Sequence, residues 1–297
     1  MKKLTYYFLL LILLAGCSTN QPQTSGDLKQ KIEEHLEKQE GTFAVWFSHL
    51  DQPELQLAIN PDTVFHAAST MKTPVMVELF KQAEQGRFIL SDSILIENRF
   101  YSIVDSSEFQ LDLDPNADDP YEAKAGEMAT IYDLNHAMIT YSSNIATNII
   151  IQMVGAEETT QTMRELGAEN IEVLRGVYDM KAFNRGLSNR TTARDLGIIL
   201  SHIANGMAVS AEKDSMMIEI MKDQFYKDVL VAGLPEDVVV ANKTGSIDGV
   251  EHDSAIVFLP DGQTYVLIYL SKDLPDDVRG REIGSEVSEM IYKFLTN

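Results

Sequence analysis

The order in which strand and helix patterns follow one another constrains the fold of this chain more than any other feature. Alternating apolar and polar residues predict strands over residues 42–50 and 54–59, and again over residues 237–242, 254–259 and 264–270. The stretch between these two groups has mainly helical patterns. Strands at both ends that enclose a helical middle predict an α+β fold, in which a helical subdomain is inserted into one antiparallel sheet.

Amphipathic helices are predicted on both flanks of the sheet and through the middle of the chain. Near the start, Leu28, Ile32 and Leu36 lie four residues apart, and residues 278–295 have a similar stripe. Apolar periodicity and capping residues predict further helices over residues 70–85, 130–140, 145–154 and 192–206. We therefore expect a sheet subdomain of about residues 27–68 and 230–297, and a helical subdomain of about residues 69–229.

The first residues have the pattern of a targeting segment. Lys2 and Lys3 precede an apolar run over residues 8–15, which is too short to span a membrane and is typical of a secretory signal. The run ends in Leu14-Ala15-Gly16-Cys17, which resembles a bacterial lipobox, where the cysteine becomes lipidated. The alternative is a plain signal peptide with an incidental cysteine. Cys17 is the only cysteine and occupies the expected junction, so we favour the lipobox.

This interpretation divides the chain into a signal peptide over residues 1–16, a lipidated linker over residues 17–26 and a folded domain over residues 27–297. The protein is then an extracytoplasmic lipoprotein, which a lipid anchor holds at the membrane. Its formal net charge of −21 excludes nucleic-acid binding, because that function needs the opposite sign. The acidic, proline-containing stretch over residues 112–122 is predicted to be an exposed loop.

Three short motifs occur in one order along the chain and together indicate a serine acyl-enzyme site. They are Ser69-Thr70-Met71-Lys72, Ser142-Ser143-Asn144 and Lys243-Thr244-Gly245. A serine alone is a poor nucleophile, because it needs a base for its proton, donors for the developing oxyanion and a cation for an acidic substrate. Each motif alone is a weak signal, since Ser210 and Lys213 also match Ser-x-x-Lys.

The first motif precedes a predicted helix, on which a separation of three residues places Ser69 and Lys72 on one face. Ser142 lies between two predicted helices, where its hydroxyl can relay a proton and Asn144 can bind a substrate amide. The alternative is that Ser143 or Asn144 only caps the next helix.

The third motif is predicted at the end of a strand, where Lys243 supplies charge and Thr244 a hydroxyl for a substrate carboxylate. Gly245 lets a substrate approach the backbone, and the N–H groups of Ser246 and Ser69 can bind an oxyanion. The alternative is an ordinary turn at the end of a strand.

The three motifs together resemble those of the penicillin-recognising serine hydrolases, and among them the class A β-lactamases. The resemblance covers residues 27–295 and implies a β-lactamase/transpeptidase-like catalytic domain that is monomeric and holds no metal or organic cofactor. It implies that Ser69 is acylated, that Lys72 takes its proton and that Ser142 passes a proton to the leaving nitrogen. The remaining positions would hold the substrate, namely Asn144, Lys243, Thr244, Gly245 and Ser246.

The sequence departs from the class A pattern at three places. Ser143 replaces an aspartate in the second motif, which we interpret as a structural change. Tyr178 occupies the position where we align the glutamate that activates the deacylating water, and a tyrosine is a poor base at neutral pH. The neighbouring Asp179 is a shorter candidate for that role. Relatives often have a basic residue near the third motif that helps to bind the substrate carboxylate. This chain has Glu251 in the stretch that follows the motif, and Glu251 would repel an anion if it pointed inward; we expect it to face solvent.

These observations predict a serine hydrolase that opens a β-lactam amide through an acyl-serine, and Tyr178 predicts slow deacylation. A D-alanyl-D-alanine peptidase that acts on peptidoglycan peptides is an alternative, and so is a β-lactam- or peptidoglycan-binding module with little turnover. A Ser-His-Asp triad with His66 or His252 is disfavoured, because Ser-x-x-Lys already supplies a base. We expect His66 to be a packing residue.

Overall fold

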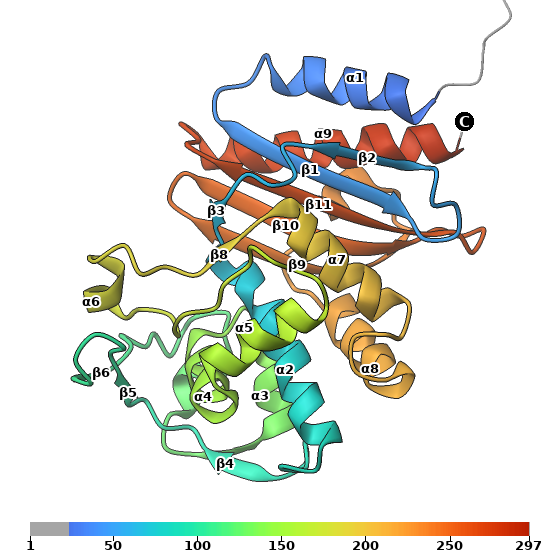
Figure 1. Ribbon diagram of the computed structural model, residues 1–297. Coiled ribbons are helices and arrows are strands. Elements are labelled where there is room, and N and C mark those ends of the chain that lie inside the picture. Colours follow the sequence, from blue (N-terminus) through green and yellow to red (C-terminus); the bar gives the residue numbers. More distant parts are fainter. Residues whose placement is uncertain (1–23, 297) are drawn as a thin grey trace, which may run out of the picture.

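The computed structural model describes residues 24–296, and at its centre lies a five-stranded antiparallel sheet (Figure 1). The strands lie side by side in the order β2, β1, β11, β10, β9, so both ends of the chain contribute to one sheet. Their bounds are Thr42–His49 for β1, Gln56–Ile59 for β2, Val239–Ile247 for β9, Val250–Phe258 for β10 and Thr264–Lys272 for β11. The predicted antiparallel sheet is therefore confirmed.

One face of the sheet is covered by the first and the last helix of the described chain, α1 (Ser25–Leu36) and α9 (Asp277–Thr296), as Figure 1 shows. The predicted stripe of α1 is fully buried against this face. Phe43, Val45 and Phe47 of β1 point into the same core, because alternate residues of a strand face the same side. The alternation of β1 and the four-residue stripe of α1 thus form two sides of one hydrophobic core.

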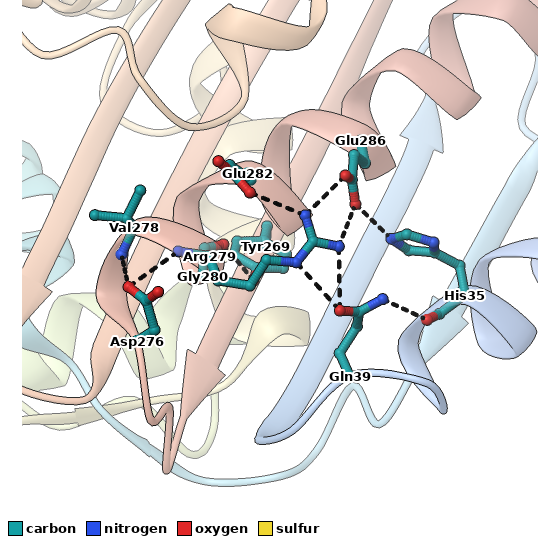
Figure 2. Close-up of polar contacts among 9 residues, drawn as sticks. All are labelled: His35, Gln39, Tyr269, Asp276, Val278, Arg279, Gly280, Glu282 and Glu286. Atoms are coloured by element: carbon teal, nitrogen blue, oxygen red, sulfur yellow. Dashed lines mark hydrogen bonds and ion pairs between the residues drawn. The ribbon is translucent and has the colours of Figure 1, made fainter.

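Polar contacts join α1 to α9 along their exposed edge (Figure 2). The Arg279 guanidinium donates to Glu282, to both carboxylate oxygens of Glu286 and to the amide oxygen of Gln39. His35 Nε2 lies 2.8 Å from Glu286, and Gln39 donates back to the carbonyl of His35. One guanidinium therefore holds the end of α1, the segment that leads from the linker, against the last helix.

The opposite face of the sheet packs on α7 (Ala193–Ala204) and on the helices of the middle of the chain. Gly197 of α7 lies over Trp46, and a Cβ at this position would come within 2.4 Å of the indole ring. Only a glycine allows α7 to approach the sheet so closely at this point. The middle helices are α2 (Lys72–Glu84), α3 (Ile131–Thr140), α4 (Asn144–Val154), α5 (Ala156–Glu165), α6 (Met180–Phe183) and α8 (Ala211–Lys222).

Short elements connect these helices. Three small ribbons pair β3 (Phe65–His66) with β8 (Arg190–Thr191), β4 (Ser93–Leu95) with β7 (Met128–Thr130), and β5 (Phe100–Tyr101) with β6 (Glu108–Phe109). The 3-10 turns are η1 (Ala68–Met71), η2 (Glu122–Lys124) and η3 (Val231–Gly233). Thr130 and Thr192 cap α3 and α7 through their hydroxyl groups, as their capping patterns predict.

Two details differ from the sequence-based expectations. The third motif does not end a strand, because β9 continues through Lys243, Thr244 and Gly245 to Ile247 and pairs with β10 along its whole length. Most of residues 112–122 are exposed as predicted, but Asp119 is buried. Within residues 24–296, no helix is long and apolar enough to cross a membrane, and no cluster of side chains has the composition of a metal site.

Candidate active site

The three motifs meet in one open cleft of about 1160 Å³ between the edge strand β9 and the middle helices. Ser69 lies in η1, a 3-10 turn that runs directly into α2, and its side chain lines the cleft. Ala68 and Ser142 line the same cleft with positive φ angles of 45° and 57°. Such angles are strained for residues other than glycine, and strain of this kind is concentrated at functional sites.

Lys72 is completely buried beneath the cleft and is surrounded by acceptors from the second motif. Its ammonium donates to the carbonyl oxygen of Ser142 at 2.7 Å, to Ser142 Oγ at 3.0 Å and to Asn144 Oδ1 at 3.1 Å. Burial, and then the charge of Lys243, lower the pKa of Lys72 well below its ordinary value, although the charge of Asp119 acts in the opposite direction. Such a lysine is disposed to lose its proton and act as a base.

Ser142 Oγ joins the first and third motifs. It lies 3.0 Å from Lys72 Nζ and 3.1 Å from Lys243 Nζ, so one hydroxyl is in contact with both ammonium groups. Lys243 is also fully buried, and burial lowers its pKa to about 7, although the charge of Asp253 opposes the shift. Ser69 Oγ itself has no hydrogen bond to any residue in the described range 24–296, which leaves it free in the cleft.

The third motif is pressed against the turn that holds Ser69. A Cβ on Gly245 would lie 3.0 Å from the backbone nitrogens of both Ser69 and Thr70. Any side chain here would therefore force β9 away from η1, and glycine keeps the two backbones in contact. Thr244, Gly245 and Ser246 all line the cleft beside Ser69, so they form one wall of backbone and hydroxyl groups.

The two residues that follow Ser142 have different roles. The hydroxyl of Ser143 accepts from the N–H of Ala146 and caps α4, as the structural interpretation of this position predicted. The side chain of Asn144 instead lines the cleft and contacts Lys72. A serine in place of an aspartate at the middle of the motif therefore leaves the surroundings of Lys72 intact.

Glu251 does not face solvent, and that expectation was wrong. It is 2% exposed, and its Oε1 accepts both from Ser246 Oγ at 3.0 Å and from the Arg281 guanidinium at 2.7 Å. Burial raises the pKa of Glu251, against these hydrogen bonds and the charge of Arg281. Arg281 reaches the cleft from α9 and also pairs with Asp228, so it supplies a cation beside the third motif.

The loop over residues 175–189 closes another side of the cleft, and Asp179 is its only carboxylate. That carboxylate is 2% exposed and accepts from Ser102 Oγ, from the N–H of Ile103 and from the N–H of Ala182, where it caps α6. Tyr178 next to it lines the cleft with 60% of its surface exposed and has a positive φ of 62°. Asp179 therefore holds the loop together, and its oxygens are already occupied.

Sequence reasoning missed Val177 as a cleft residue. Its backbone N–H donates to Asn148 Oδ1 at 2.6 Å, and its carbonyl accepts from Asn148 Nδ2 at 3.0 Å. Asn148 lies one turn after Asn144 on α4, so this double contact fixes position 177 against the helix of the second motif. Only the spacing of two asparagines on one helix face could have suggested this contact.

The two histidines form no catalytic triad. The His252 ring is buried, lies 2.9 Å from the carbonyl of His66 and accepts from the N–H of Ser271, and burial lowers its pKa to about 4. His66 lines the cleft, and its Nδ1 accepts from the N–H of Ala68. Neither ring contacts the Ser69 hydroxyl, which has no partner within the described residues.

Comparison with known proteins agrees with this geometry. Residues 27–295 match the family described as "Beta-lactamase enzyme family". The chain belongs to this family. Its members are serine enzymes that hydrolyse β-lactams, and the present chain is such a serine hydrolase. Residues 1–18 match a prokaryotic membrane lipoprotein lipid attachment site, so the protein is an extracytoplasmic, lipid-anchored lipoprotein. Cys17 itself lies outside the described residues.

Individual relatives cover nearly the whole chain. A β-lactamase of Bacillus licheniformis is 28% identical over 301 aligned residues, which are 96% of this chain and 92% of the relative. The solved structure of PBP-A is 31% identical, has a TM-score of 0.78 and covers 91% of this chain and 96% of its own. A leucine-to-glutamate variant of PBP-A, in an acyl-enzyme complex with penicillin G, has a TM-score of 0.79 at 31% identity and covers 92% and 98% of the two chains.

Proposed function

We propose that Ser69 is the nucleophile that opens a β-lactam amide and that Lys72 is the base that takes its proton. As Ser69 Oγ bonds to the carbonyl carbon, its proton passes to the neutral Lys72 amine, and the N–H groups of Ser69 and Ser246 receive the developing oxyanion. The amide C–N bond then breaks. The Ser142 hydroxyl gives its proton to the leaving nitrogen and regains one from Lys72, so the proton count balances.

The observation that carries this proposal is the continuous contact from Lys72 Nζ through Ser142 Oγ to Lys243 Nζ, at 3.0 and 3.1 Å. It gives Ser142 access to the proton on Lys72 and keeps a second cation close to the leaving group. We infer that the substrate carboxylate is bound by Lys243 and Thr244 and by Arg281, which lines the cleft together with Thr244. The subdomain division proposed from the sequence places this cleft between the sheet part and the helical part.

We further infer that hydrolysis of the acyl-serine is slow. The only carboxylate of the loop 175–189 is Asp179, whose oxygens accept three hydrogen bonds and cap α6. Burial acts to raise the pKa of Asp179, but the hydrogen bonds from Ala182, Ile103 and Ser102 together with the charge of Arg175 outweigh it and lower the pKa, and a carboxylate with a lowered pKa is a weaker base. A missing general base typically slows a step by about 10²–10⁴-fold.

A D-alanyl-D-alanine peptidase or a binding module with little turnover would share the acylation step. The observation that favours them is the same lack of a free carboxylate in the loop, because neither needs rapid hydrolysis of a penicilloyl ester. Release of D-alanine from a peptide that ends in D-alanyl-D-alanine would favour the peptidase. An acyl-serine that persists with both penicillin and peptide would favour the binding module.

The experiment is a time course with a fluorescent penicillin, in which formation and loss of the protein adduct are measured separately. We expect a burst of adduct formation, then a slow steady state, with the label on a peptide that contains Ser69. Ser69→Ala should form no adduct. Ser210→Ala is the matched control, because Ser210 belongs to the second Ser-x-x-Lys match and only caps α8. Labelling of Ser69→Ala would contradict the nucleophile, and rapid turnover without a burst would contradict slow deacylation.

A further inference from the structure

The cleft has an unusual charge for a site that receives an anionic substrate. Six carboxylates line it against two guanidinium groups, Arg175 and Arg281. Arg281 is already paired with Asp228 and Glu251. The carboxylates are Asp118, Asp119, Glu122, Asp228, Asp248 and Glu251. The proposed place of the substrate carboxylate is at Lys243 and Thr244, whereas the six carboxylates of the cleft repel anions.

Asp119 differs from the other acids of the cleft because it is buried and also has a carboxylate oxygen without a hydrogen bond. It is 8% exposed, and its Oδ1 accepts from the N–H of Tyr121 at 2.9 Å. Its Oδ2 is buried and has no hydrogen-bond partner among residues 24–296, although the side chain lines the cleft. A buried carboxylate oxygen without a partner costs free energy, and a cation or a donor that enters the cleft would offset that cost.

The surroundings of Asp119 suit an organic cation. Tyr226 lines the same cleft as Asp119. Burial raises the pKa of the Tyr226 phenol, and the charges of Asp118, Asp119 and Asp228 raise it further. Phe225 packs edge-on against Tyr226 at 5.2 Å and stacks on Tyr141 at 5.4 Å, and both tyrosines line the cleft. Aromatic rings beside carboxylates are a favourable surface for an ammonium group. Metal ions would prefer several carboxylates around one point, and no such group exists in the described chain.

Asp118 and Asp119 come from the loop over residues 112–122, whereas Lys243 and Thr244 come from β9. Ser69 lines the same cleft as the strand and the loop, so a substrate attached to Ser69 lies within a cleft that both elements form. We propose that Asp119, with Asp118 beside it, binds a protonated amine on the acyl side chain of the substrate. This inference rests on the proposed function and adds the substrate class, which is a β-lactam or peptide acyl donor that carries an amine.

Three penicillins that differ in one substituent test the inference. Benzylpenicillin has a neutral side chain, ampicillin adds an α-amine to it and carbenicillin adds an α-carboxylate. Their acylation rates are measured by competition with the fluorescent penicillin at pH 6.5 and low ionic strength, where the α-amine is mostly protonated. We expect ampicillin to acylate about tenfold faster than benzylpenicillin, and carbenicillin about tenfold slower, as one favourable or unfavourable charge contact predicts.

Variants identify the residue responsible. Asp119→Asn keeps the acceptor for Tyr121 and should bring the ampicillin-to-benzylpenicillin ratio close to one. Asp118→Asn, at an exposed position that cannot decide folding, should lower the ratio less. Asp112→Asn removes the same charge from an exposed residue of the same loop that does not line the cleft, and it should leave the ratio unchanged.

Two peptides that end in lysyl-D-alanyl-D-alanine, one with a free ε-amine and one with an acetylated ε-amine, distinguish the sources of the amine. If the peptide with the free amine competes more strongly with the fluorescent penicillin, peptides with an amine are also substrates of this site. If the two peptides compete equally or not at all, only β-lactams with an amine are. Equal acylation by all three penicillins overturns the inference and leaves the proposed function intact. A ratio that is unchanged in Asp119→Asn also overturns it. Absence of any adduct overturns both.

Discussion

The two sides of the cleft differ in what their polar groups are bonded to. Around Ser142, the ammonium groups of Lys72 and Lys243 are buried and have acceptors from two different motifs. In the loop over residues 175–189, the one carboxylate accepts hydrogen bonds from neighbouring residues, and Tyr178 lines the cleft and is largely exposed. The groups around Ser142 are placed to transfer protons, whereas the carboxylate of the loop 175–189 stabilises the conformation of that loop. Formation and hydrolysis of an acyl-serine thus place separate demands on one cleft.

The largest effect is expected on the proton-moving side. Lys72→Ala removes the proposed base and should slow adduct formation by about 10²–10⁴-fold. Lys81→Ala on the same helix is the control, because its ammonium contacts only Thr162 and Glu165, away from the cleft. The measurement is the rate of labelling by the fluorescent penicillin. Near-normal labelling of Lys72→Ala would contradict the role of the Ser142 side of the cleft in proton transfer.

A carboxylate added to the loop over residues 175–189 should give this loop a general base for hydrolysis of the adduct. Val177→Glu is expected to speed hydrolysis of the adduct by about 10²-fold, because Asn148 fixes this position against α4 and a base there has a defined origin. Tyr178→Glu should have a smaller effect, since that side chain is largely exposed. Val177→Gln has the same shape without a base and should change little. A faster Tyr178→Glu would show that the effective position is one residue later.

The pH dependence of acylation should report both lysines. Lys243 is charged below its pKa of about 7, so its hold on the substrate carboxylate is lost as the pH rises through that value. Lys72 must be neutral to act as a base, so acylation also falls at low pH. We expect kcat/KM for acylation to fall about tenfold per pH unit on the alkaline side. Lys243→Arg keeps its charge and should lose this decline. A decline that persists in Lys243→Arg would assign it to another group.

The smallest effect is expected at Asp179. Asp179→Asn removes one acceptor oxygen from a buried network and should lower the free energy of unfolding by about 1 kcal/mol. The rate of adduct hydrolysis should stay within about twofold of the wild type, a difference of less than ~0.5 kcal/mol. Chemical unfolding and the decay of the fluorescent adduct measure the two quantities. A tenfold slower decay of the adduct would identify Asp179 as the base for hydrolysis and would contradict a purely structural role of the loop.

The sequence predicted the architecture well because it rests on local periodicity. The stripe of Leu28, Ile32 and Leu36 and the alternation of β1 are buried on one face of the sheet as expected. Turn and strand ends were less certain, and β9 extends through the third motif because pairing with β10 continues there. A hydrogen-bonded partner strand decides that length, and a single segment does not encode it.

The sequence by itself determined which chemical groups this protein has, because the three motifs supply the serine, the two lysines and the amide and hydroxyl groups to which we assign the chemistry. Tertiary structure decided which of these groups are buried and which have hydrogen-bond partners. Glu251 was expected in solvent but is buried against Arg281, a residue 30 positions later that no local pattern connects to it. Val177, Asn148 and Asp119 likewise gained their places through packing. Burial and partners set the charge, pKa and freedom of a side chain, and these depend on residues that only the folded chain brings together.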